Sequence, residues 1–221
     1  MDKMLKNQEK RKENDNVVTK VFVPLMMYYV VYNAVVIGGQ TLWEGQIQTI
    51  IKMLGMALGG AAVYPYFKRE TTLKLKKSLS PREGLALILT GILLSLGLNL
   101  LFSLTGLPQN NEQYQQVAEV QFALPLWLAF LFYGVLSPVV EEMVFRGIAC
   151  NWLGRKVSPR AGMAGSALLF GVFHGNLVQL LYASIMGMVL AYVYQKYENL
   201  KAPVLVHAAA NVAIYCVTYF F

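Results

Sequence analysis

The chain has 221 residues, of which 56% are hydrophobic and only 14% are charged, and its formal net charge is +7. A composition this apolar indicates an integral membrane protein and argues against one or two soluble domains. The positive charge does not indicate nucleic-acid binding, because the basic residues lie in blocks between apolar runs, where they act as signals of membrane topology. The two cysteines, Cys150 and Cys216, lie far apart in apolar surroundings, which favours packing groups over a disulfide or a nucleophile.

The apolar runs predict an all-α, polytopic bundle of about seven membrane-spanning segments. Residues 1–20 form a charged, basic arm without the features of a cleavable signal peptide, so we expect the first apolar segment to remain in the mature protein. The expected spans are 21–37, 49–67, 84–104, 122–153, 161–174, 177–197 and 202–221. The segment 161–174 is rather short, since a crossing usually takes about twenty residues.

Local signals refine this picture. The quartet Ser80-Pro81-Arg82-Glu83 has the pattern of a capping box with proline at the first helical position, so the third helix is expected to begin there. Residues 105–121 are expected to form a polar loop. Small residues at helical spacing predict close helix contacts in the second and sixth spans: Gly55, Gly59 and Gly60, and Ala183, Gly187 and Ala191.

Lysine and arginine content alternates from one connection to the next, being high before the first span, absent after it and high again after the second. The positive-inside rule therefore places the N-terminus in the cytoplasm and the C-terminus outside. The chain shows no convincing internal repeat, which disfavours an inverted-repeat transporter.

The most informative stretch is 137–147, which reads Ser-Pro-Val-Val-Glu-Glu-Met-Val-Phe-Arg-Gly. Ionisable groups at membrane depth cost several kcal/mol unless they are partnered or hydrated, so they indicate a functional site. Glu142 and Arg146 are four residues apart on one helix face and are expected to form a mainly structural ion pair. Glu141, rotated by about 100° from Glu142, has no local cation and is the better candidate for a general base.

The chain contains two histidines, His174 and His207, and both lie in apolar segments. Asn211 follows His207 by four residues, so the two side chains share a helix face. From the helical rise we expect Glu141, His174, His207 and Asn211 to lie about 9 to 20 Å from the cytoplasmic helix ends, close enough to share one buried cavity.

Such a cavity suits amide hydrolysis. A carboxylate and an imidazole would position and deprotonate a water molecule, while a second imidazole and an amide would stabilise the oxyanion. Ser137 and Ser184 are the nearest hydroxyl groups in sequence, and we expect them to be packing residues and not nucleophiles.

Three motifs together resemble those of the CPBP intramembrane proteases, also called the Abi or type II CAAX prenyl endopeptidase family. They are Glu141-Glu142-x-x-x-Arg146, Phe170-x-x-x-His174 and His207-x-x-x-Asn211. The resemblance covers about the last 100 residues, so it makes 122–221 the catalytic core, with 21–121 as additional transmembrane helices. It also implies a bacterial, multi-pass protein of the plasma membrane.

The resemblance implies that Glu141 and His174 activate the water and that His207 and Asn211 form the oxyanion site. The remaining motif residues would be supporting members of the site: Glu142, Arg146 and Phe170. The implied substrate is a membrane-associated or prenylated CAAX-type peptide, or a peptide leader. The implied partners are therefore the lipid bilayer and a peptide, with no nucleic acid.

Several alternatives stay open. Zinc could be bound by Glu141, His174 and His207, although the chain lacks a His-Glu-x-x-His motif, and a cofactor-free mechanism is favoured. The chain could be a non-catalytic immunity or scaffold protein, a transporter with a proton relay, or a bundle whose polar groups only hold helices together. The membrane face on which the cavity opens is also undecided by the motifs.

Overall fold

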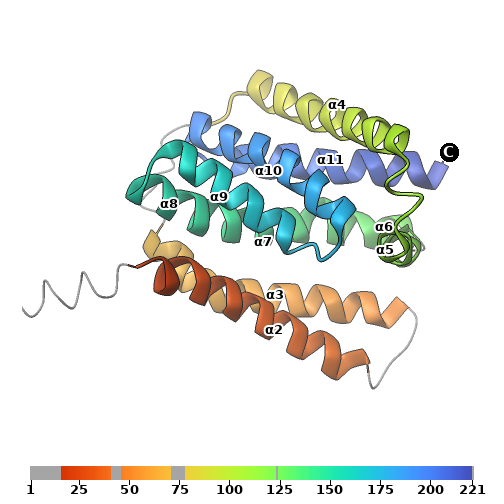
Figure 1. Cartoon of the computed structure of the whole chain (residues 1–221), viewed down its shortest axis with the longest axis horizontal. Helices are drawn as coiled ribbons and strands as arrows, with labels where there is room; N and C mark the ends of the chain where they lie inside the picture. Colours follow the sequence, from red (N-terminus) through yellow and green to blue (C-terminus); the bar gives the residue numbers. More distant parts are fainter. Residues whose placement is uncertain (1–15, 41–45, 71–77, 123, 221) are drawn as a thin grey trace, which may run out of the picture.

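The computed structural model describes residues 16–40, 46–70, 78–122 and 124–220, so most of the predicted basic arm lies outside the described residues. The described part contains helices and turns but no strand, which confirms the all-α prediction. Most of the helices run along one common direction (Figure 1). Their bounds are η1 Val18–Phe22, α2 Val23–Gln40, α3 Gln46–Glu70, α4 Pro81–Thr105, α5 Glu112–Phe122, α6 Leu126–Ala129, η2 Phe130–Leu136, α7 Ser137–Glu142, η3 Met143–Cys150, α8 Asn151–Lys156, α9 Pro159–Val172, α10 Leu177–Tyr197 and α11 Lys201–Phe220.

Within the described ranges, six helical segments are long and apolar enough to cross a membrane. They are Val18–Gly39, Ile47–Arg69, Pro81–Thr105, Leu126–Lys156, Leu177–Tyr197 and Lys201–Phe220. Large apolar side chains project from their outer surfaces, as Leu93, Leu100 and Leu104 do on α4. A lipid-facing exterior explains this exposure, and the chain is a multi-pass membrane protein close to the predicted bundle of about seven spans.

The remaining predicted span, 161–174, forms the short helix α9. Its 14 residues extend about 21 Å, less than the thickness of a bilayer core. α9 ends at Val172, so His174 lies in the following turn and not inside a helix as predicted. Gly175 permits this turn through its positive φ of 79°, and Asn176 then caps α10 by accepting a hydrogen bond from the backbone N–H of Gln179 at 2.9 Å.

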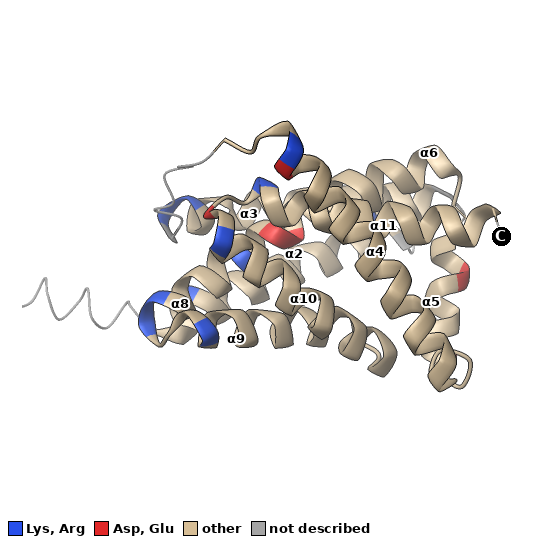
Figure 2. Ribbon diagram, turned by 90° about the horizontal axis from the view of Figure 1, so that it is seen from above, with Lys and Arg blue, Asp and Glu red and all other residues tan. Residues whose placement is uncertain are grey.

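The prediction of a polar loop over 105–121 was wrong in part, because the structure forms α5 there. Asn111 begins the helix, its side-chain oxygen accepting a hydrogen bond from the backbone N–H of Tyr114 at 2.8 Å. α5 lies across one end of the bundle, beside α6 and the C-terminal end of α11 (Figures 1 and 2). Its composition is polar and none of its residues is fully buried, so no long apolar stripe marks it in the sequence.

The long helix that carries the carboxylates runs continuously from α6 to α8. Wider, π-type turns occur on both sides of α7, in η2 and η3. Pro138 lies in this region and has no N–H to donate, which removes one bond of the regular α-helical ladder. The backbone N–H of Ser137 instead reaches the carbonyl of Phe132. π-type turns are frequent at functional sites because they shift side chains relative to a regular helix.

Small residues set the distances between helices, as the sequence predicts. A Cβ atom on Gly59 would lie 2.9 Å from the Tyr28 ring, and one on Gly60 would lie 3.1 Å from Val140. α3 therefore packs closely on both α2 and α7. Gly91 of α4 is tighter still, since a Cβ atom there would lie 2.2 Å from the carbonyl oxygen of Val206 on α11.

Candidate functional site

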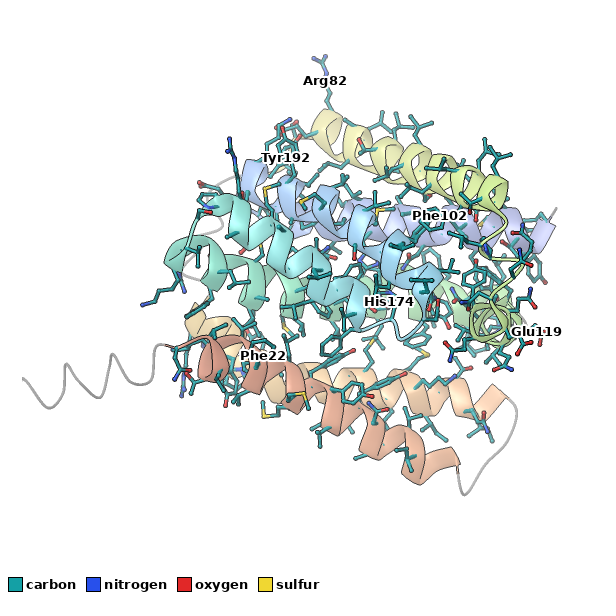
Figure 3. All side chains as sticks on the ribbon, viewed as in Figure 1. Phe22, Arg82, Phe102, Glu119, His174 and Tyr192 are labelled. Atoms are coloured by element: carbon teal, nitrogen blue, oxygen red, sulfur yellow. The ribbon has the colours of Figure 1, made fainter. Side chains whose placement is uncertain are left out.

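A cavity of about 360 Å³ lies within the bundle. All four residues predicted to be catalytic line it, namely Glu141, His174, His207 and Asn211. They come from α7, from the turn after α9, and from α11. In Figure 3, His174 lies inside the bundle, between the α4–α10–α11 side and the α2–α3 hairpin. The structure thus brings together side chains that are up to 70 positions apart in the sequence.

Glu142 lies at the centre of a buried chain of charges. One oxygen of its carboxylate lies 3.1 Å from Nε of Arg146, which is the ion pair expected from the spacing, and neither side chain is exposed. The other oxygen lies 2.9 Å from Nδ1 of His207. Glu142 therefore links its own helix to α11, a contact that the sequence did not reveal.

Arg146 is held by groups from three elements. Besides its contact with Glu142, it donates a hydrogen bond from one terminal nitrogen to the carbonyl of Gly187, at 3.2 Å. Its guanidinium carbon lies 4.6 Å from the centre of the Phe170 ring. A cation over an aromatic face is attracted by the ring quadrupole. Gly187 has no side chain, so the α10 backbone lies within hydrogen-bonding distance of Arg146. Arg146 therefore fixes α10 and Phe170 around the buried carboxylate.

Glu141 faces the cavity and differs from Glu142 in its partners. The hydroxyl of Ser137, one helical turn earlier, donates a hydrogen bond to Oε1 of Glu141, with an O–O distance of 2.5 Å. The other carboxylate oxygen lies 3.8 Å from Nε2 of His207. The Glu141 side chain is 15% exposed, whereas that of Glu142 is fully buried. Glu141 therefore keeps one oxygen available to a molecule in the cavity.

The hydrogen bonds of the two imidazoles determine where their protons lie. Nδ1 of His174 is 2.7 Å from the carbonyl oxygen of Phe170. A carbonyl can only accept, so His174 carries a proton on Nδ1 and, in its neutral form, has a free lone pair on Nε2. His174 is thus arranged to accept a proton from a ligand.

His207 is arranged differently. Ionised Glu142 can only accept, so His207 also carries a proton on Nδ1. Its Nε2 faces Glu141 and donates a hydrogen bond only when the ring is doubly protonated. The carboxylates of Glu142 and Glu141 flank the ring, on the Nδ1 and Nε2 sides respectively. His207 is therefore suited to stabilise negative charge in the cavity.

Asn211 lies one turn beyond His207 on α11. Its Nδ2 donates a hydrogen bond to the backbone carbonyl of Tyr133, at 2.9 Å, which fixes the orientation of the amide. An amide nitrogen has two protons, so one remains for a ligand oxygen. Asn211 thus supplies a second donor to the same cavity.

Sequence reasoning missed several residues of the site. Ser137 was assigned to packing, but its hydroxyl contacts Glu141; the four-residue spacing on one helix face was the available signal. Tyr133 contributes its backbone carbonyl, which no side-chain motif can reveal. Tyr114 of α5 also lines the cavity, and its partial burial raises the pKa of the phenol above its ordinary value of 10.0.

The carboxylate and imidazole side chains of the cavity are of the types that bind zinc in proteins. In the parts of the chain that the structure describes, no three His, Cys, Asp or Glu side chains are grouped so that they could hold a metal ion. The positions of Glu141, His174 and His207 do not group these side chains around a common point where zinc would bind.

A second hollow, of about 850 Å³, lies beside the cavity between α6–η2 and α11. Its lining is almost wholly apolar and includes Trp127, Phe130 and Tyr219. Tyr133 and Asn211 line both hollows. The apolar groove therefore adjoins the polar site at the position of Asn211.

Comparisons with known proteins agree with the motifs. Residues 123–213 match the family described as type II CAAX prenyl endopeptidase Rce1-like. Over 106 residues the chain is 27% identical to the protein named "Putative membrane peptidase YdiL" of Bacillus subtilis (strain 168). That alignment covers 48% of this chain and 43% of the Bacillus protein, so the chain matches less than half the length of this relative. No solved structure shows a significant match.

The helical bundle with a buried acid–imidazole cluster defines a multi-pass membrane protein with an internal polar site. Residues 123–213 match this family of type II CAAX prenyl endopeptidases, and the resemblance inferred from the motifs is confirmed. The matched residues 123–213 contain every motif residue of the site.

Proposed function

We propose that the protein is an intramembrane endopeptidase that hydrolyses a peptide bond with a water molecule activated by Glu141 and His174. The observation that carries the proposal is the convergence of Glu141, His174, His207 and Asn211 on the walls of one cavity. The match of residues 123–213 to the type II CAAX prenyl endopeptidase family supports it.

In the proposed reaction, a water molecule in the cavity gives a proton to Glu141 or to Nε2 of His174. The resulting hydroxide attacks the carbonyl carbon of the scissile peptide bond and forms a tetrahedral intermediate. Ser137 and the Phe170 carbonyl hold the two bases in place. A positioned base of this kind contributes about 10² to 10⁴ in rate.

The carbonyl oxygen of the substrate becomes negatively charged in this step. Nε2–H of doubly protonated His207 and the free amide proton of Asn211 are the proposed donors to this oxyanion. Removal of one such donor costs about 10² to 10³ in kcat in other hydrolases. The proton taken from water then passes to the leaving amine, so one peptide and one water give a carboxylic acid and an amine.

The proposed substrate is a membrane-associated peptide, either a prenylated CAAX-type peptide or a peptide leader. The groove next to Asn211 supports a substrate that carries an apolar group, because its aromatic lining offers an apolar surface beside the reacting site.

The test is cleavage of a fluorogenic prenylated CAAX peptide and a panel of leader peptides by purified protein. Wild type is compared with Glu141→Gln and His174→Ala, each with and without a chelator. Glu119→Gln is the matched control, because Glu119 is exposed on α5 and does not line the cavity. We expect cleavage to be lost in the two site variants, kept in the control, and insensitive to the chelator.

Other results would contradict the proposal. Cleavage that is lost with the chelator and restored by zinc would identify a metalloprotease. Activity retained in Glu141→Gln would remove Glu141 from the reaction. If wild type cleaves no peptide of the panel while Glu141→Gln still binds one of them with unchanged affinity, a non-catalytic scaffold or immunity protein is the better description.

A further inference from the structure

The basic residues of the bundle gather at one end (Figure 2). They lie in the first or last turns of successive helices, which meet at this end because neighbouring segments run in opposite directions. The residues concerned are Lys20, Lys68, Arg69, Arg82, Arg155, Lys156, Arg160, Lys196 and Lys201. The opposite end, with α5, α6 and the end of α11, has no such group among the described residues. Basic flanks remain on the cytoplasmic side of a membrane protein, so this distribution orients the bundle.

The cavity lies in the opposite half of the bundle. On α4, which begins at its basic end, the lining residues are Asn99 and Phe102, close to the last residue, Thr105. On α10, which runs the other way, the lining begins at Val178, the second residue of the helix. In Figure 3, Phe102 lies toward the α5 end, whereas Arg82 and Tyr192 lie toward the basic end.

α5 and the turn before it form the outer wall of the cavity. Pro108 and five residues of the 112–122 segment line it: Tyr114, Val117, Ala118, Gln121 and Phe122. This segment is polar and lies outside the candidate spans, so we expect it at the surface of the membrane. No residue of the basic end contributes to the lining.

Lys52 is the one described lysine that departs from this pattern. It lies near the start of α3, in the half of the bundle that holds the cavity, and it lines the cavity itself. Met56, one turn further on, is buried and also lines the cavity, so the helix face that carries Lys52 points into the bundle. A lysine inside a cavity is part of the site and not of a basic loop, so it does not reverse the orientation.

We infer that the cavity opens on the membrane face opposite the basic ends, which is the non-cytoplasmic face. The substrate class that follows, resting on the proposed function, is a peptide segment presented on the outer side of the membrane, such as an exported or translocated peptide. A peptide confined to the cytoplasm would have to cross the basic half of the bundle to reach Glu141.

The orientation is tested by thiol labelling in bacterial cells that produce the protein. The background carries Cys150→Ala and Cys216→Ala, which remove both native thiols. Ala118→Cys places a thiol at a half-buried position of α5 that lines the cavity, and Val157→Cys places one at an exposed position of the basic end. A membrane-impermeant maleimide is added to intact spheroplasts and to permeabilised ones.

We expect Ala118→Cys to react in intact spheroplasts and Val157→Cys to react only after permeabilisation. The reverse pattern would overturn the inference. A second measurement uses the chain with both native cysteines, with a reporter fused after α11, which ends on the same side of the bundle as α5 (Figure 1). Alkaline phosphatase is expected to be active there and green fluorescent protein to be dark, and the opposite result would also overturn the inference.

Neither measurement depends on peptidase activity, so failure of the proposed function can be distinguished from failure of the inferred orientation. Labelling of Ala118→Cys in intact spheroplasts, without cleavage of any peptide, would support the orientation and contradict the peptidase function. The opposite case is Glu141-dependent cleavage of peptide added to inside-out vesicles but not of peptide added to right-side-out vesicles. That result would support the peptidase function and overturn the inferred orientation.

Discussion

The two adjacent glutamates occupy different environments although they are neighbours in the sequence. Glu142 is enclosed by Arg146 and His207, whereas Glu141 faces the cavity, where it accepts a hydrogen bond from Ser137 and lies farther from His207 Nε2. Two like charges on successive residues repel, and each needs its own cation or donor. Arg146 compensates the charge of Glu142, so Glu141 is the carboxylate that remains for the proposed role of general base.

Loss of the Glu142 charge is expected to destabilise the protein. In Glu142→Gln, Arg146 remains buried without a counter-charge, and breaking a buried pair in this way costs about 3–5 kcal/mol. The free energy of unfolding in detergent measures the effect. The double variant Glu142→Gln/Arg146→Met is expected to recover part of the loss, because it also removes the unpaired charge of Arg146. An unchanged stability of the single variant would contradict the buried charge chain.

The hydroxyl of Ser137 is expected to matter for turnover. A hydrogen bond to a charged group contributes about 1.5–3 kcal/mol, so Ser137→Ala is expected to lower kcat about tenfold to a hundredfold. Ser184→Ala is the matched control, because the buried Ser184 hydroxyl has no hydrogen-bond partner among the described residues. Equal effects of the two substitutions on peptide cleavage would show that the Ser137 contact has no special importance.

At the scale of the helices, close contacts between elements position the site. α4 and α11 are in direct contact at Gly91 and Val206, and His207 is the next residue on α11. α9 and α10 form a hairpin whose turn holds His174, and Gly187 brings the α10 backbone to Arg146. The site is therefore sensitive to the spacing of helices that carry no catalytic side chain.

Substitution of Gly91 tests this dependence. In Gly91→Ala the added Cβ atom would lie 2.2 Å from the Val206 carbonyl oxygen, so α11 must move. Overpacking of this kind costs about 1–3 kcal/mol, and we expect peptide cleavage to fall as His207 and Asn211 shift. Gly97→Ala on the same helix meets no atom within 4 Å, so it is expected to keep activity and to be neutral or slightly stabilising. Thermal unfolding and cleavage assays of both variants provide the comparison.

At the scale of the whole molecule, the usual arrangement of a soluble protein is reversed. Large apolar side chains cover the outside of the spans, while the buried charges of Glu142 and Arg146 lie inside the bundle, next to the polar cavity. Lipid solvates the apolar exterior, so the polar interior and the close helix contacts determine the packing.

The two cysteines report on this packing. Cys150 is only 1% exposed and packs with Ala191 and Tyr194, whereas Cys216 is half-buried at the apolar groove. In mild detergent we expect a small thiol reagent to modify Cys216 in the folded protein and Cys150 only on unfolding. Mass spectrometry of the labelled protein over a denaturant series gives both rates. Equal modification of the two thiols without denaturant would contradict the packing around Cys150.

The sequence by itself determined the helical class, the positions of the long spans and the motif residues of the site. These features depend on local composition and spacing, such as apolar runs of membrane length, the Ser80 capping box and the four-residue separation of Glu142 and Arg146. Only the tertiary structure decided that Glu142 pairs with His207, that Asn211 is held by the Tyr133 carbonyl and that residues of α5 line the cavity. Those contacts join residues far apart in the chain or use backbone groups, so they depend on how the helices pack and leave no local pattern in the sequence.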